Sequence, residues 1–504
     1  MQLVLALDRS QKRPLYKTLA AAIKKAIYEG RLKPGESLPS VRELADQYSL
    51  SRSTVLRCYE DLHTQGYIRS AARLGTFVSP QMDTTRSFAF DHESVKNESQ
   101  PTHLKEIEWS ESAQRLALAE EEEACLSVDL NFGLPAPDTI AVQQWERSIV
   151  RHGKYDEQRL SYDLDVFGVA ALRKELTEYL NRARGVRCNQ SRIVILTGVQ
   201  QGLDMLCRLL VNPGDAVAVE NPGYSQARRT FVMHGARLVP FAVDNDGILA
   251  DDVINCGERL KILYLTPSHH DPTGAVLSTE RRKKLLKWAA ENGTIIVEDD
   301  YDCEYRYGRE PLQSMQGLDD GDCVVYASTF WRTLGNLTQI GYMVLPQRLT
   351  SMFHRAKTLI QRDLPTLEQY ALADFIREGH FERHIHKSRQ LFQKRRQTLI
   401  YNFTLHMGRL VRFARESGGL HIMVTFSEMF SEKDILNAAR VAQLPLNSTA
   451  NYYIESRAER EYLVPFGLMS EQQIEERIAK FASILRPQST TPTAFPTPTT
   501  SALA

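Results

Sequence analysis

The chain has 504 residues, more than one hydrophobic core usually organises, so two or three folded units are expected. Apolar residues (42%) and charged residues (25%) occur in the proportions of a soluble, core-forming protein, and the 62 basic side chains equal the 62 acidic ones. No apolar run reaches about 18 residues and no basic start precedes an apolar segment, which argues against a membrane span and a secretory signal.

The seven cysteines are scattered along the chain, and no two of them form a CxxC pair. This usage argues against a disulfide framework and against a zinc knuckle. It predicts a cytoplasmic protein that works in a reducing environment.

The neutral total conceals an uneven distribution of charge. Residues 1–80 contain 13 Lys or Arg and 7 Asp or Glu, a net charge of +6, whereas residues 81–124 contain 4 and 11, a net charge of −7. A basic segment followed by an acidic one is the distribution expected when the first segment contacts nucleic acid.

Residues 1–79 carry the signals of a small helical domain with a hairpin. Apolar residues recur every fourth position from Leu15 to Ile27, which predicts a helix with one apolar stripe. Ser40, three residues before Glu43, is predicted to cap a short second helix. The expected elements are helices at 15–27, 41–48 and 52–65 and strands at 67–68 and 76–78, the order of a winged helix-turn-helix.

A helix-turn-helix places the start of its second helix at base edges in the major groove. Hydroxyl and guanidinium groups there suit phosphates and guanine. The candidate DNA contacts are Arg42, Ser51, Arg52, Ser53, Thr54 and Arg57 on the helices and Arg69 and Arg73 on the hairpin. The alternative is that the module binds protein and that its arginines form a solvated face.

The run from GRLKPGESLPS to GTFV, with the blocks LPSVRELA and SRSTV, resembles the DNA-binding domain of the GntR family of bacterial transcription regulators. The resemblance implies a double-stranded DNA operator as partner. It carries DNA contacts onto Arg42 and the positions from Ser51 to Thr54, and it adds the wing glycine Gly75.

Two segments have the composition of connecting or terminal chain. Residues 80–124 are polar and acidic, which predicts a flexible linker with a helical stretch around Gln114–Ala119. Residues 487–504 are rich in Pro and Thr and almost uncharged, which predicts a disordered tail.

Residues 125–486 alternate buried-strand and helix patterns, typical of a largely parallel sheet. The predicted strands are 193–196, 216–219, 262–265, 294–297, 323–326 and 341–344. Blocks such as ILTGVQQGLDML, NPGDAVAVENPGY and IIVEDDYDCEYRY make residues 127–486 similar to the fold-type I aminotransferases, in the MocR-type form that is fused to a GntR head. The resemblance implies an α/β/α unit with a mainly parallel sheet and a smaller C-terminal α+β subdomain.

The same resemblance implies a pyridoxal-phosphate site. The turn at Gly198 lies between a strand and a helix, where backbone amides can meet a phosphate. The positions that resemble cofactor contacts are Val199, Gln200, Tyr224, Asp299 or Asp300 (partner of the pyridinium nitrogen) and Tyr301. The alternatives for the acidic run 298–304 are a strand end with solvated charges and a metal site, for which EF-hand spacing is missing.

The family pattern Thr-Phe-Ser-Lys-Thr-Leu, which holds the Schiff-base lysine, is altered here: Trp331 and Arg332 replace Ser and Lys. A guanidinium stays protonated and offers no amine lone pair for an internal aldimine. Gln339 replaces the phosphate-pairing arginine, and the segment Tyr462–Phe466 lacks the carboxylate-binding arginine. Covalent cofactor binding and transamination are therefore not expected, and no motif surrounds Lys357, the nearest lysine downstream.

The loop histidines His269 and His270 and the adjacent Asp271 are expected near the mouth of the same pocket. Such a histidine pair is usually structural, although it can orient a new ligand. Asp271 and Arg332 complete the candidate ligand residues, and a small anionic or amino-acid-like effector is the ligand class they suggest.

Three functions are compatible with these patterns, and the first is the prediction: a DNA-binding transcription regulator whose large domain senses a small molecule or only dimerises. An active aminotransferase with an accessory DNA-binding head is disfavoured by Arg332. A scaffold that has lost DNA binding is disfavoured by the intact arginine blocks. A homodimer is expected, because fold-type I relatives build their sites between subunits and one winged helix reads only a half-site.

Overall fold

The computed structural model describes residues 14–28, 31–71, 75–79, 109–120, 142–153, 165–307, 312–361, 365–414, 418–454 and 460–485. The chain forms two compact units, residues 1–107 and 108–504. The predicted tail and most of the predicted linker lie outside the described residues.

One part of the predicted linker is folded. Glu111–Glu120 forms helix α4, which includes the predicted helical stretch. The helix belongs to the second unit and packs against α8 (Ser225–Met233), where Arg115 donates to the Met233 carbonyl at 3.4 Å. The prediction of a flexible linker up to residue 124 is therefore wrong for this stretch, whose place against α8 depends on contacts more than a hundred residues apart.

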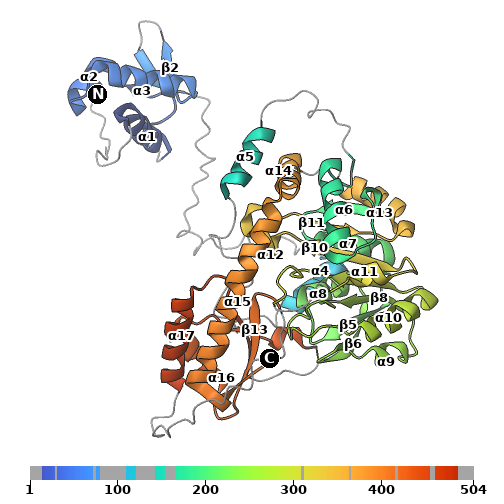
Figure 1. Cartoon of the computed structure of the whole chain (residues 1–504). Helices are drawn as coiled ribbons and strands as arrows, with labels where there is room; N and C mark the ends of the chain where they lie inside the picture. The colour runs from blue at the N-terminus through green and yellow to red at the C-terminus, as the bar shows by residue number, and fades with distance from the viewer. Residues whose placement is uncertain are drawn as a thin grey trace. The chain divides into compact units, whose positions relative to one another are not determined.

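The first unit combines three helices with a small antiparallel sheet (Figure 1). The helices are α1 (Leu15–Tyr28), α2 (Val41–Tyr48) and α3 (Arg52–Thr64). The strands are β1 (Ser37–Leu38), β2 (Ile68–Ala71) and β3 (Gly75–Val78), in the order β1-β3-β2. The sequence did not predict β1, because two residues are too few to show an alternating pattern.

The core of the first unit lies between α1 and α3. Leu19 and Ile23 on α1 and Val55 and Leu62 on α3 are fully buried. Leu15 is 48% exposed, so the apolar stripe of α1 begins one turn later than predicted. Burial of this stripe supplies most of the stability of such a small unit.

The start of α2 follows the predicted capping box. Ser40 Oγ accepts from the Glu43 backbone N–H at 3.2 Å, and the Glu43 carboxylate accepts from the Ser40 backbone N–H at 2.8 Å. These two bonds satisfy backbone donors that the first turn of a helix leaves without partners.

The second unit is built on an eight-stranded sheet of order β4-β11-β10-β9-β8-β5-β6-β7. Its central strands are parallel, whereas β11 runs antiparallel to both of its neighbours and β7 runs antiparallel to β6. The strands are β4 (Ile193–Leu196), β5 (Ala216–Asn221), β6 (Arg237–Asp244), β7 (Gly247–Ile248), β8 (Leu260–Leu265), β9 (Ile295–Asp299), β10 (Val324–Thr329) and β11 (Gly341–Val344). All six predicted strands are present.

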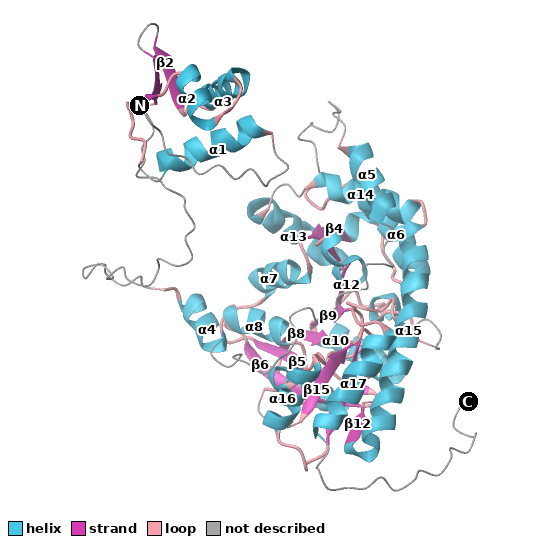
Figure 2. Cartoon of the chain, turned by 90° about the vertical axis from the view of Figure 1, so that its left-hand side faces the viewer, coloured by secondary structure: helices cyan, strands magenta, loops and turns pink. Residues whose placement is uncertain are grey.

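Helices surround this sheet in both views (Figures 1 and 2). They are α5 (Val142–His152), α6 (Ala170–Arg184), α7 (Val199–Leu210), α8, α9 (Ala250–Ile254), α10 (Thr279–Asn292), α11 (Met315–Leu318), α12 (Trp331–Leu334), α13 (Gln347–Ile360) and α14 (Thr366–Arg377). The alternation of strands and helices along the chain is the predicted α/β pattern.

The long helix α15 (His380–Met407) leads into a C-terminal subdomain (Figure 2). The subdomain holds an antiparallel sheet of order β12-β13-β15-β14 with α16 (Glu432–Ala442) and α17 (Glu471–Leu485). Its strands are β12 (Val411–Phe413), β13 (His421–Phe426), β14 (Asn447–Ser448) and β15 (Glu461–Pro465). The rings of Phe403 on α15 and Phe481 on α17 meet edge to face at 6.3 Å, which ties the long helix to this subdomain.

Candidate nucleic-acid interface and ligand cavity

The start of α3 presents an exposed polar surface. Ser51 is the N-cap of the helix, and its hydroxyl accepts from the Thr54 backbone N–H at 3.1 Å and lies 2.9 Å from the Ser53 hydroxyl. Arg52 is exposed beside this cap, whereas Val55, one turn further along the helix, is buried. A free guanidinium at the first turn of the second helix has the placement that base reading requires.

The other candidate DNA contacts are distributed around α3. Arg42 on α2 and Arg69 on β2 are exposed, and Gly75 begins β3 with a φ of 113°, a conformation that favours glycine. The guanidinium of Arg57 lies 4.5 Å from the ring centroid of Tyr16 on α1, so this side chain makes a cation–π contact within the first unit. Arg73 lies outside the described residues.

A cavity of about 340 Å³ lies at the ends of β4, β8, β9 and β10 in the second unit. All seven candidate ligand residues of this unit line it: Val199, Gln200, Tyr224, Asp271, Asp299, Tyr301 and Arg332. Trp331 and Gln339 line it as well. Parallel strands place their carboxyl ends at one edge, and this is where α/β proteins usually bind ligands.

The first turn of α7 forms one wall of the cavity. Gly198 caps this helix with a φ of 89°, and Val199 and Gln200 follow as its first residues. The nearby Gly341 leaves no room for a side chain, because a Cβ there would lie 2.8 Å from the backbone of Gly198. The first N–H groups of a helix have no intrahelical partners, so a cavity wall formed by the first turn of α7 suits an anion.

The two candidate carboxylates have different environments, and only Asp299 lines the cavity. The Tyr264 hydroxyl donates to Asp299 Oδ2 at 2.5 Å. Its Oδ1 is buried and accepts no hydrogen bond from the described part of the chain. Burial raises the pKa of Asp299 to about 7, so near neutral pH this carboxyl group can accept or release a proton.

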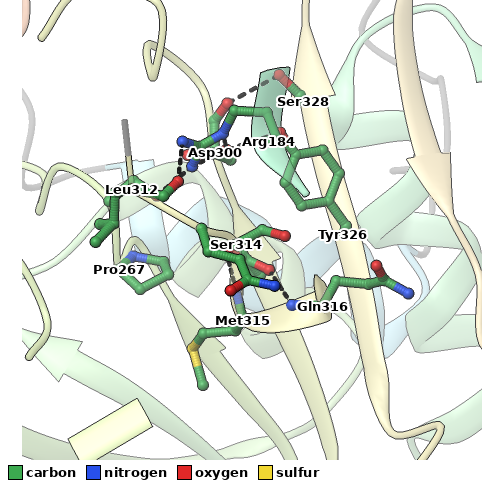
Figure 3. Close-up of polar contacts among 12 residues, drawn as sticks. Arg184, Pro267, Asp300, Leu312, Ser314, Met315, Gln316, Tyr326 and Ser328 are labelled. Carbon is green, nitrogen blue, oxygen red and sulfur yellow. Dashed lines mark hydrogen bonds and ion pairs between the residues drawn. The ribbon is translucent and has the colours of Figure 1, made fainter. Parts of the chain in front are cut away.

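Asp300 is occupied by an internal ion pair (Figure 3). Its Oδ2 accepts from Arg184 Nε at 2.8 Å and from the Tyr326 hydroxyl at 2.7 Å. The remaining donors of Arg184 reach the Ser268 hydroxyl at 2.8 Å and the Leu312 carbonyl at 2.5 Å. Asp300 therefore fastens α6 to the end of β9 and is not part of the cavity wall.

The acidic run 298–304 is not a group of solvated charges. Glu298, Asp299, Asp300, Asp302 and Glu304 are all buried. The described residues contain no group of three or more His, Cys, Asp and Glu side chains that could hold a metal ion. The described part of the chain therefore supports neither a strand end with solvated charges nor a metal site for this run.

Asp271 also lines the cavity and is linked to the C-terminal subdomain. The hydroxyl of Tyr452, which follows β14, donates a hydrogen bond to its carboxylate. Burial raises the pKa of Asp271 to about 6, and the positive charge of Arg332 opposes that rise. The guanidinium of Arg332 lies 5.4 Å from the ring centroid of Tyr301 and 5.0 Å from that of Trp331. The cavity thus combines one guanidinium, two carboxyl groups and aromatic walls.

The two loop histidines stand behind the cavity wall, not within it. His269 Nδ1 lies 2.9 Å from Asp302 Oδ2 and 3.1 Å from the Tyr301 hydroxyl. His270 contacts the Thr273 hydroxyl at 2.7 Å and the Pro222 carbonyl at 3.1 Å, and burial lowers its pKa to about 3. Both rings support the loop that carries Asp271, which agrees with the structural interpretation.

Comparison with known proteins assigns both units. Residues 15–78 match the family of bacterial regulatory proteins named gntR, and residues 130–453 match aminotransferase class I and II. Over 474 residues the chain is 31% identical to YdeL, an uncharacterized HTH-type transcriptional regulator of Bacillus subtilis, covering 94% of this chain and 97% of that protein. It is 30% identical over 485 residues to MocR, a probable rhizopine catabolism regulatory protein of Rhizobium meliloti, covering 95% of each. The chain belongs to the MocR-type GntR regulators.

The second unit of this MocR-type chain has the fold-type I aminotransferase fold. A kynurenine aminotransferase of Pyrococcus horikoshii superimposes with a TM-score of 0.64 and 27% identity, covering 75% of this chain and 95% of that one. The predicted fold class is thereby confirmed, including the C-terminal subdomain. No helix among the described residues is long and apolar enough to cross a membrane.

Two tyrosines that donate hydrogen bonds to the carboxyl groups of the cavity were absent from the sequence prediction. Tyr264 lies inside the buried strand β8, where the sequence pattern indicates a residue of the hydrophobic core. Tyr452 comes from the other subdomain, almost two hundred residues away from Asp271 in the sequence. Only the folded chain brings these hydroxyls to Asp299 and Asp271.

Proposed function

We propose that this chain is a sequence-specific transcription regulator that acts on double-stranded DNA in the bacterial cytoplasm. Its aminotransferase-like unit dimerises the protein and senses a small molecule, and it does not catalyse transamination. The observation that carries the DNA-binding role is the exposed first turn of α3, where Arg52 stands beside a serine cap. The match to the gntR family, the similarity to HTH-type regulators and the exposed Arg42 and Arg69 support the same role.

Capture of fragmented genomic DNA by the purified chain tests this role. A recurring sequence motif should be enriched among the captured fragments. The affinity for that motif should fall steeply as salt rises, because phosphate contacts release counterions. Uniform capture of all fragments would contradict sequence-specific binding.

The cavity keeps one of the groups that pyridoxal phosphate requires and lacks others. The buried Oδ1 of Asp299 is an acceptor that a protonated ring nitrogen would use. Arg332 and Trp331 line the same cavity where the family pattern has lysine and serine, and a guanidinium supplies no amine for a Schiff base. The residues do not fit a covalently held cofactor, and we assign no chemical step to this cavity. It suits a small anionic or amino-acid-like effector, with Arg332 as the charge partner.

Arg332→Lys alone is expected not to restore covalent cofactor binding. Trp331 and Gln339 would remain at the phosphate end, and a misplacement of about 1 Å can already cost roughly 100-fold in rate. The measurement is incubation with excess pyridoxal phosphate, desalting, borohydride reduction and mass spectrometry. The matched variant also carries Trp331→Ser and Gln339→Arg, and it should give more pyridoxyl adduct than the single variant. A stoichiometric adduct on one lysine of the native chain, with amino-acid-dependent spectral change, would contradict the proposal and show that the chain is a pyridoxal-phosphate-dependent enzyme.

The proposed regulator is expected to be a homodimer in solution. One winged helix reads only a half-site, so two heads are needed for a symmetric operator. Light scattering at micromolar concentration should give about twice the 57.4 kDa mass of one chain. Truncation to residues 109–504 should leave the dimer intact if the large unit forms the interface. A monomeric mass for the full chain would contradict the proposal.

A further inference from the structure

A second cavity, of about 280 Å³, lies between α6, α15 and the segment that follows β9. It shares no lining residue with the first cavity. The cavity lies at the lower end of the volumes usual for ligand sites, so it suits a molecule of a few heavy atoms.

A buried carboxyl group forms one wall of the second cavity. Glu304 is 7% exposed, and the Tyr179 hydroxyl donates to its Oε1 at 3.2 Å. Its Oε2 is buried and accepts no hydrogen bond from the residues that the structure describes. Burial raises the pKa of Glu304 to about 7. A buried acceptor without a donor is costly, and an ammonium group placed there would remove that cost.

Guanidinium groups complete the same cavity. Arg389 is exposed on α15, and its Nε donates to the backbone carbonyl of Glu304 at 3.0 Å, which fixes its position next to the acid. Arg306, in the segment after β9, is the second. Arg184 and Glu382 also line the cavity, and they are paired with Asp300 and Arg182. The cavity therefore has an acidic group, Glu304, and a basic group, Arg389, on its wall.

We propose that the second cavity binds a small zwitterionic amino acid, with its ammonium group on Glu304 and its carboxylate on Arg389. A simple anion would leave the buried carboxyl without a donor, and a simple amine would leave the guanidinium pole unused. The inference rests on the sensing role proposed above, for which it names a ligand class and a site separate from the first cavity.

The position of the second cavity lets a ligand bound there influence the first cavity. The segment from Asp299 to Arg306 lines both: Asp299 and Tyr301 face the first cavity, and Glu304 and Arg306 face the second. A ligand that orders this segment from one side would change its conformational freedom on the other.

Isothermal titration of the full chain with glycine, L-alanine and L-serine tests the site, with acetate and methylamine as single-pole probes. At least one amino acid should bind, and both single-pole probes should bind at least tenfold more weakly. Glu304→Gln and Arg389→Gln should each weaken the amino acid at least tenfold. Lys387→Gln, which removes an exposed charge from the same helix outside the cavity, should not.

Three outcomes would overturn the site. One is that none of the amino acids binds. Another is that acetate binds as tightly as they do, which would make the cavity an anion site. The third is that Arg332→Gln abolishes binding while Glu304→Gln and Arg389→Gln leave it unchanged, which would place the amino acid in the first cavity. Because Arg389 is exposed, its variant remains informative even if Glu304→Gln misfolds. DNA affinity of the same preparations, measured without amino acid, reports separately on the regulator proposal.

Discussion

Arg184→Met is expected to cost the large unit about 3–5 kcal/mol of its free energy of unfolding, because it leaves the carboxylate of Asp300 buried without its cation. Both groups are buried, and the guanidinium uses all three nitrogens in hydrogen bonds. Methionine fills a similar volume without charge, so the loss measures the broken ion pair more than a cavity.

Arg187→Met is the matched control for this prediction. Arg187 lies three residues further along the chain and pairs with Asp320, but both side chains are largely exposed. An exposed pair of this kind contributes about 0–1 kcal/mol. Tryptophan fluorescence during urea unfolding follows the large unit alone, since all four tryptophans (109, 145, 288 and 331) lie in it. Equal losses in the two variants would contradict a structural role for the Arg184–Asp300 pair.

The pH dependence of the loss gives a second readout. In the native chain burial pushes the pKa of Asp300 upward, but the charge of Arg184 and the donors Tyr326 and Ser268 outweigh burial, so its pKa lies below the ordinary value. Without Arg184, burial dominates and the folded pKa rises above the unfolded one. The stability of the variant should then fall as pH increases from 5 to 8, and the double variant with Asp300→Asn should show less of that fall.

Local signals predicted the architecture well, because each depends on neighbours in the sequence. The capping box at Ser40 and the buried strands of the sheet are patterns of a few consecutive residues. The last two strands at one end of the sheet, β6 and β7, escaped prediction, since β6 is only partly buried and contains Pro240, and β7 has two residues.

The cavity was predicted less completely, for a physical reason. Sequence spacing left Asp299 and Asp300 as equal candidates, because adjacent residues of a strand end point in opposite directions and the pattern does not say which faces a ligand. Arg184, more than a hundred residues away, forms an ion pair with Asp300, which leaves Asp299 as the carboxyl group that lines the cavity. The second cavity depends on α6 and α15 meeting the segment after β9, a juxtaposition that no local motif encodes.

Arg52→Ala is expected to weaken binding to the captured DNA motif about 10–100-fold, which corresponds to the roughly 1–3 kcal/mol of a good bidentate base contact. The side chain is exposed at the first turn of α3, and the buried stripe of Val55, Tyr59 and Leu62 does not depend on it. The circular dichroism and melting temperature of the variant should therefore match those of the native chain.

Arg42→Ala should weaken binding in a different manner, and the comparison separates base reading from phosphate contact. Arg42 lies just inside the start of α2, where a backbone phosphate is the expected partner, so its loss should lower affinity for all sequences and reduce the salt slope by about one. Loss of Arg52 should instead reduce the preference for the motif over unrelated DNA. Lys17→Ala removes the same charge from the exposed face of α1, which packs against the inner side of α3, and it should change neither quantity by more than about twofold. Fluorescence anisotropy at several salt concentrations measures both quantities for all three variants. Unchanged affinity in both arginine variants would mean that α3 does not enter the groove in this orientation, since its exposed first turn would then carry neither base nor phosphate contacts.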